Sequence, residues 1–199
     1  MVLFLNLWIK LFFVLTPFFG LTMFLSMTEK YDEARRRKLA LAVSAATAIL
    51  CLLLFLVGKH IFSLFGIALD SFRIGAGVLL LLSGIELVHI KATPSDSDYD
   101  GDVAVVPLAM PIIVGPATTG TLLVMGAELN TISAKIIGCL SLLSAVACMA
   151  VVLLAGSLIQ RCLRARGIAI LSKLTGLILA ALAAQMIMTG IQGLLGIHS

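Results

Sequence analysis

Long apolar runs without charged residues follow one another along this chain, and they constrain its fold more than any other feature. Between Lys38 and Lys59, for example, every residue is apolar, small or hydroxyl-bearing. A helix needs about 20 mostly apolar residues to cross the hydrocarbon core of a bilayer. At 61% hydrophobic and 12% charged residues, the chain is more apolar and less charged than soluble domains. The sequence therefore predicts an all-α, polytopic membrane protein.

The apolar runs predict six transmembrane helices. We place them at about 3–25, 38–58, 73–90, 103–125, 135–159 and 173–195, with ends good to about 2–4 residues. They form a single membrane domain, 1–199, with halves of about 1–92 and 103–199 joined by an acidic cytoplasmic loop, 93–102. The apolar segment Ile61–Asp70 is too short to cross and is interpreted as re-entrant or interfacial.

Two of the predicted helices, the first and the fourth, are interrupted. The segment Leu11–Phe24 contains Pro17 and Gly20. The segment Val103–Val124 contains three prolines and two glycines, namely Pro107, Pro111, Gly115, Pro116 and Gly120. Proline removes a backbone donor and glycine lets the chain turn. Helices broken at matching places in two halves indicate a transport site near the bilayer midplane.

The backbone groups freed at such breaks could bind a small zwitterion. Half-helix N-termini attract a carboxylate, and carbonyl and hydroxyl oxygens accept hydrogen bonds from an ammonium group. The candidate substrate-binding residues lie at the two breaks: Thr16, Pro17, Gly20, Thr22, Gly115, Pro116, Thr118 and Thr119. The alternative is that these prolines and glycines only kink ordinary membrane helices.

An internal repeat supports the pairing of the two breaks. The stretch Gly66–Ser71 (GIALDS) resembles Gly167–Ser172 (GIAILS), and Pro17 matches Pro116 at nearly the same offset. Two units of three helices in tandem must insert in opposite orientations, which predicts a 3+3 inverted repeat. Small residues that allow close helix packing include Gly75, Gly77, Ala180 and Ala184.

The distribution of Lys and Arg predicts the orientation. They cluster in Lys30–Lys38, between the first two helices, and in Arg161–Lys173, between the last two. Positive residues favour the cytoplasmic side, so both termini are expected outside. The net charge of +4 comes from these membrane flanks, so a nucleic-acid partner is not expected.

Few other residues carry chemistry. Glu86, near the end of the third helix, is a candidate for coupling transport to H⁺ or Na⁺, although snorkelling or pairing with His89 also explains it. Enzyme motifs such as HExxH, GxSxG and the P-loop are absent, so no catalytic residues, metal site or cofactor are expected. The four cysteines contain no Cys-x-x-Cys pair and are interpreted as packing residues.

The stretch VVPLAMPIIVGPATTG (Val105–Gly120) resembles the helix-4 signature of the MarC-related membrane proteins (UPF0056), commonly V-P-L-A-x-P-x-x-x-G-P-G-T. The resemblance covers essentially the full length. It implies six spans in the bacterial cytoplasmic (inner) membrane, and some relatives are described as transporters of small neutral amino acids. The family often has D-P-x-G-N-x-P in helix 1, where this chain retains only Pro17 and has Thr16, Phe19, Gly20 and Thr22 at the other specified places. In helix 4, Ala117 replaces a glycine.

The leading hypothesis is a secondary transporter of small neutral amino acids or similar small polar solutes, with the lipid bilayer and the solute as its partners. One alternative is a drug or metabolite exporter of the multiple-antibiotic-resistance type. Another is a structural or regulatory membrane protein that transports nothing. The sequence leaves the oligomeric state open.

Overall fold

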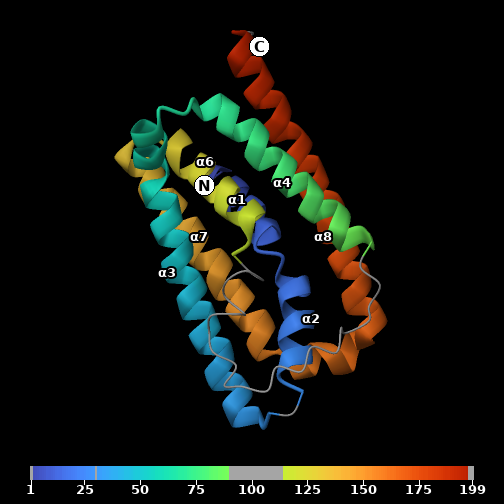
Figure 1. Ribbon diagram of the computed structural model, residues 1–199. Coiled ribbons are helices and arrows are strands. Elements are labelled where there is room, and N and C mark those ends of the chain that lie inside the picture. The colour runs from blue at the N-terminus through green and yellow to red at the C-terminus, as the bar shows by residue number, and fades with distance from the viewer. Residues whose placement is uncertain (1, 30, 90–113, 197–199) are drawn as a thin grey trace.

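The computed structural model describes residues 2–29, 31–89 and 114–196, and all regular secondary structure in these ranges is α-helical (Figure 1). The helices are α1 (Val2–Val14), α2 (Pro17–Met27), α3 (Glu33–Phe65), α4 (Leu69–His89), α6 (Pro116–Glu128), α7 (Ile132–Leu154) and α8 (Gly156–Leu195). The predicted all-α class is therefore confirmed.

Several helix ends follow from capping chemistry. The Asp32 side chain accepts a hydrogen bond from the Arg35 N–H at the start of α3, and the Thr131 hydroxyl accepts one from the Ala134 N–H at the start of α7. These contacts satisfy donors that a helix leaves open at its N-terminus. At the other end of α3, Gly66 adopts a left-handed conformation with φ of 63°. Glycine is suited to this position because it has no Cβ.

Five segments are long and apolar enough to cross a membrane: Val2–Met27, Glu33–Gly58, Leu69–His89, Ile132–Leu154 and Arg166–Leu195. They overlap five of the six predicted spans. The remaining prediction, 103–125, lies partly outside the described residues, and the predicted loop 93–102 lies wholly outside them. Within the described part, α6 has 13 residues, or about 20 Å of helix, which is too short to cross a bilayer alone.

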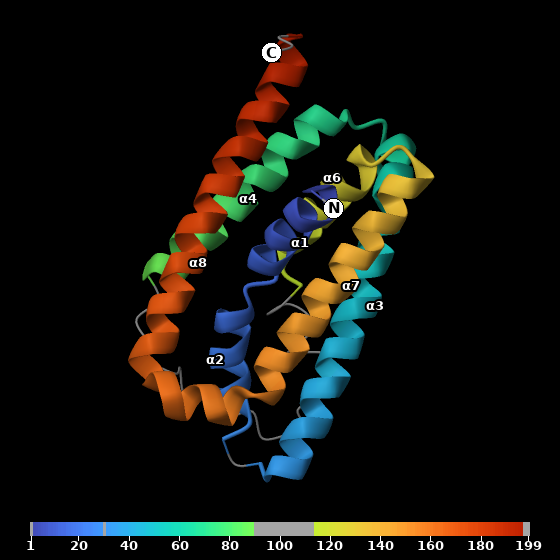
Figure 2. The same ribbon diagram turned by 180° about the vertical axis from the view of Figure 1, so that it is seen from behind.

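One predicted boundary and the interpretation of one segment need correction. The fifth span ends at Leu154 rather than near 159, because the chain turns at Ala155 and α8 begins at Gly156. Figure 2 shows the first part of α8 running across one end of the bundle before the helix turns along it. The segment Ile61–Asp70 is the helical end of α3, the turn at Gly66 and the start of α4. Its apolar side chains Leu64 and Phe65 are exposed, as expected at a membrane edge.

The helices form a bundle with two outer pairs. Figures 1 and 2 show α4 and α8 side by side along one flank, α3 and α7 along the other, and α1, α2 and α6 between them. Large apolar side chains such as Leu53, Leu82 and Ile170 are exposed on the outer helices. Such exposure would be unfavourable in water but suits contact with lipid tails.

Glycines let α4 and α8 approach closely. A Cβ added at Gly84 would lie 2.8 Å from the Gly176 carbonyl oxygen, and a Cβ at Gly176 would lie 2.6 Å from the Gly84 oxygen. Gly77 likewise faces Ile187. Close packing within the chain is confirmed for Gly77, whereas Gly75 is exposed and has no neighbour within 4 Å of an added Cβ.

The short helix α6 is held tightly between α3 and α4. A Cβ at Gly126 would overlap the carbonyl group of Phe55 on α3. A Cβ at Gly120 would lie 2.8 Å from the Ala76 Cβ on α4. From Leu122 to Ala127, every residue of α6 is buried. This packing holds the middle of α6 against α3 and α4, and the N-terminal end of α6 forms part of the candidate site.

Candidate functional site

The first interruption lies between α1 and α2. Thr16 connects the two half-helices in a left-handed conformation, with φ of 45° and ψ of 56°, and it is the one described non-glycine residue with positive φ. A β-branched residue in this region is a true outlier and costs on the order of 1–3 kcal/mol. Pro17 then begins α2 without an N–H group. The prediction of a broken first helix is confirmed.

The backbone at this break has a defined hydrogen-bond pattern. The Thr16 N–H donates to the Phe13 carbonyl at 3.0 Å, and the Gly20 N–H donates to the Thr16 carbonyl at 2.9 Å. The latter is the first helical bond of α2. Helix geometry therefore leaves the N–H groups of Phe18 and Phe19 without a partner within α2. Thr16 provides no side-chain cap for them.

At the second interruption, α6 begins much as α2 does. Pro116 is the first residue of α6, after an extended Gly115, and the Thr119 N–H donates to the Gly115 carbonyl at 2.9 Å. Ala117 and Thr118 are buried in the first turn. Both α2 and α6 thus begin with proline, but Pro17 is buried, whereas Pro116 is exposed and the buried residues follow it. The residues before 114 in this predicted helix lie outside the described part of the chain.

The two breaks meet in space. The hydroxyl of Thr118, in the first turn of α6, donates a hydrogen bond to the carbonyl oxygen of Val14, the last residue of α1, at 3.3 Å. Thr118 and Val14 are 104 positions apart and both are buried. Val14 and Ala117 also belong to one apolar cluster with Leu80 of α4. Figure 1 shows the start of α6 beside the junction of α1 and α2.

Helix dipoles give this junction both electrostatic signs. The C-terminal end of α1 presents carbonyl oxygens, while the N-terminal ends of α2 and α6 present N–H groups. A helix end carries about half an elementary charge, negative at the C-terminus and positive at the N-terminus. The junction can therefore accept hydrogen bonds from a cationic group and donate them to an anionic one without any ionised side chain.

The predicted site residues do not all lie at this junction. Thr16, Pro17, Gly115, Pro116 and Thr118 flank it directly. Gly20 and Thr119 are in the first turns of α2 and α6. Thr22 is different. It is exposed, and its hydroxyl donates to the Phe18 carbonyl of its own helix at 3.0 Å.

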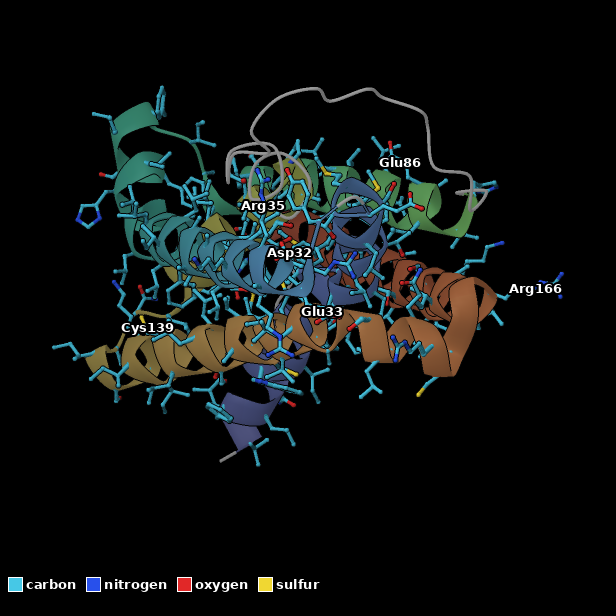
Figure 3. The ribbon with its side chains drawn as sticks, turned by 90° about the horizontal axis from the view of Figure 1, so that it is seen from below. Asp32, Glu33, Arg35, Glu86, Cys139 and Arg166 are labelled. Atoms are coloured by element: carbon cyan, nitrogen blue, oxygen red, sulfur yellow. The ribbon has the colours of Figure 1, made fainter. Side chains whose placement is uncertain are left out.

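Glu86 also lies apart from the junction. It is exposed at the outer edge of α4, near the helix end (Figure 3). Among the described residues Glu86 makes no ion pair, and His89 contacts the Ile85 carbonyl at 2.9 Å instead. A hollow of about 580 Å³ lies elsewhere again, at the bundle end where α3 and α8 begin, lined by Glu33, Ala34, Arg37, Ser157, Leu158 and Arg161.

The sequence analysis did not identify the structural contacts of two arginines. Arg73 of α4 pairs with Asp70 and with Glu128 at the end of α6. Arg36 of α3 donates from Nη2 to the Thr28 carbonyl, just after α2, at 2.8 Å. The spacing Asp70 to Arg73 places the two side chains on one helix face and was a usable signal. The partners of Arg36 and Arg73 on α2 and α6 depend on tertiary packing, which sequence spacing does not reveal.

Comparison with known proteins gives a consistent result. Residues 1–195 match the model of the MarC family, described as integral membrane proteins. A UPF0056 membrane protein of Methanocaldococcus jannaschii is 34% identical over 195 residues, covering 94% of each chain. The UPF0056 membrane protein YhcE of Escherichia coli K12 is 31% identical over 195 residues, covering 94% of this chain and 90% of its own. No solved structure matches significantly. The chain belongs to the MarC family of integral membrane proteins.

Proposed function

We propose that this protein is a secondary transporter of small neutral amino acids or similar small polar solutes. The solute would bind where the end of α1 meets the starts of α2 and α6. The observation that carries the proposal is the buried contact between the Thr118 hydroxyl and the Val14 carbonyl. It brings the end of α1 and the start of α6, which come from the two halves of the chain, to one point inside an apolar bundle.

The energetics of the bilayer favour a polar occupant at this point. In hydrocarbon, each backbone group without a hydrogen bond costs several kcal/mol, so broken helices are tolerated where they bind polar groups or line water. A neutral amino acid carries a carboxylate for the N-termini of α2 and α6 and an ammonium group for the carbonyls that end α1. Its small side chain would suit the alanine and threonines in the first turn of α6, whereas the first turn of α2 adds Phe18 and Phe19.

A 3+3 inverted repeat is part of this proposal. The reciprocal packing of Gly84 and Gly176 fits it, because these residues lie on the third and sixth predicted helices. The shared pattern of α2 and α6, each beginning with proline beside the junction, supports it too. In such a repeat the two broken helices enter from opposite faces, and rocking of one half against the other exposes a fixed site alternately.

Orientation and coupling complete the proposal. Arg35, Arg36, Arg37, Arg161 and Arg166 belong to the ends of α3 and α8 at one end of the bundle. This supports a cytoplasmic position for that end and extracytoplasmic termini, in a bacterial inner membrane. An H⁺ or Na⁺ gradient would drive transport, with Glu86 as the candidate coupling carboxylate. A Glu86→Gln variant that keeps gradient-driven uptake would exclude Glu86 from coupling.

The test is uptake of labelled glycine and alanine into proteoliposomes, with and without an imposed H⁺ or Na⁺ gradient. We expect saturable uptake above that of empty liposomes, accelerated by one of the two gradients. The absence of uptake under either gradient, from protein shown to be folded, would contradict the proposal. Changed drug sensitivity on deletion with no amino-acid flux would favour an exporter, and a stably co-purifying partner without flux a regulatory role.

A further inference from the structure

The short helix α6 is anchored at both ends. Its first turn contacts Val14 at the junction, and its last residue, Glu128, is held by Arg73 of α4. Glu128 Oε1 accepts hydrogen bonds from Arg73 Nε at 3.0 Å and Nη2 at 2.9 Å. A helix of 13 residues is a stiff rod, so a displacement of its Glu128 end also moves the first turn.

Arg73 is the centre of a partly shielded ionic network. Its side chain is 18% exposed, and its Nη1 atom also donates to Asp70, one turn earlier on α4. The Asp70 carboxylate in turn packs against Gly193 of α8, and the Asp70 carbonyl oxygen lies 2.6 Å from a Cβ built on Gly190. The network thus ties α6 to α4 at the point where α4 packs on α8. The Arg73 side chain is largely shielded, whereas the Glu128 side chain is 41% exposed, and both Arg73 nitrogens contact the same carboxylate oxygen, Oε1.

A corresponding arrangement holds the other half-helix. After the last turn of α2, the Thr28 carbonyl accepts a hydrogen bond from Arg36 Nη2 at 2.8 Å, and Arg36 is half-buried on α3. Both α2 and α6 begin at the junction, and each is held at its far end by an arginine of a neighbouring long helix. These far ends lie at opposite ends of the bundle (Figures 1 and 2).

We propose that Arg73 is a positioning residue that holds the first turn of α6 against the junction and keeps the junction closed toward the Arg73 end of the bundle. Arg36 does the same for α2 toward the opposite end. Loss of the Arg73 contacts frees α6 to move away from α1 and opens the junction to one face alone. The inference rests on the proposed function for its role in transport, but closure itself can be measured without any solute.

The measurement is the sidedness of thiol labelling at the junction. Thr119→Cys, in the first turn of α6, serves as reporter in a chain whose four native cysteines are replaced by alanine. A membrane-impermeant maleimide is added to either face of oriented proteoliposomes. A separate Ser71→Cys reporter at the exposed start of α4 identifies the Arg73 face.

We expect Arg73→Gln to accelerate labelling of the reporter from the Arg73 face by about threefold to fivefold, equivalent to about 0.6–1 kcal/mol of lost closing free energy. Labelling from the other face should not change. Glu128→Ala should have the same effect, and the double variant should be no faster than either single variant, since all three remove the same contact between α4 and α6. Arg36→Leu should accelerate labelling from the opposite face.

The matched control is Arg37→Gln. Arg37 pairs with Glu33 at 3.8 Å within α3, and both side chains are largely exposed, so the reporter should react at its parental rate. Parental labelling rates in both Arg73→Gln and Glu128→Ala would overturn the proposal, as would faster labelling from both faces, which indicates general loosening. A wild-type protein without uptake would contradict the proposed function. The labelling rates would still test whether Arg73 keeps the junction closed, because labelling needs no solute.

Discussion

Removal of the Thr118 hydroxyl tests the contact on which the candidate site depends. Thr118→Val keeps the shape of the side chain but loses its hydrogen bond to the Val14 carbonyl. The bond is 3.3 Å long, beyond the usual 2.7–2.8 Å of a hydroxyl donor, so its strength lies at the lower end of the range. Thr118 is only 5% exposed, however, so water cannot readily replace it. We therefore expect a loss of about 1 kcal/mol in the free energy of unfolding.

A loss of this size is measurable. It corresponds to a decrease of about 2–4 °C in melting temperature for a chain of this length. If the solute binds at the junction, the same change should raise the KM for alanine uptake by about fivefold, the factor that 1 kcal/mol represents. Thr118→Ser, which retains the hydroxyl, should restore most of the affinity. Thermal unfolding in detergent and proteoliposome uptake measure the two effects.

Thr175→Val is the matched control. Thr175 is 1% exposed, and its hydroxyl donates to the Leu171 carbonyl of its own helix at 2.9 Å. The same chemical change is therefore made at a similarly buried site away from the junction, and the KM should stay at its wild-type value. The reasoning would be refuted if Thr118→Val changed neither KM nor stability, or if Thr175→Val raised KM equally.

Two further predictions concern the backbone. Thr16→Asn should raise the free energy of unfolding by about 1 kcal/mol, because asparagine tolerates the left-handed conformation better than a β-branched residue does. Thr16→Val, which keeps the β-branch, should not raise it. A stabilised Thr16→Val variant would show that backbone strain is not the cause. Gly84→Ala should lower the free energy of unfolding by about 1–3 kcal/mol, because its Cβ meets the Gly176 backbone, whereas Gly75→Ala should be neutral or slightly stabilising. Thermal unfolding measures all four variants, and equal effects of the two alanine substitutions would contradict the close packing of α4 on α8.

Much of the fold could be predicted from sequence, because an apolar segment long enough to cross a bilayer must satisfy its own backbone hydrogen bonds and therefore forms a helix. The break at Pro17 and the start of α6 at Pro116 were also predictable, since proline acts on its own helix and needs no tertiary context. The predicted end of the fifth helix was wrong. Ala155 and Gly156 do not by themselves mark the end of a helix clearly, because apolar residues continue past the turn. Which glycine is buried could not be predicted, because Gly75 and Gly77 differ only in the helix face on which they lie.

The candidate site was predictable only in part. Hydroxyl-bearing residues near the breaks were found, but sequence could not distinguish Thr118, which reaches across to Val14, from Thr22, which bonds within its own helix. Backbone acceptors such as the Val14 carbonyl carry no sequence signal. The interaction of Arg73 with Glu128 joins residues 55 positions apart, and a long-range ion pair of this kind follows from packing rather than local pattern.

Solute protection of the junction tests the central claim most directly. The Thr119→Cys reporter is labelled with maleimide in the presence of increasing alanine, with a bulky anionic solute such as citrate as control. If small neutral amino acids bind where α1, α2 and α6 meet, alanine should slow labelling saturably, with a midpoint equal to its KM for uptake, and citrate should have no effect. Saturable alanine uptake with no change in labelling rate at any concentration would contradict the account, because the solute would then bind elsewhere.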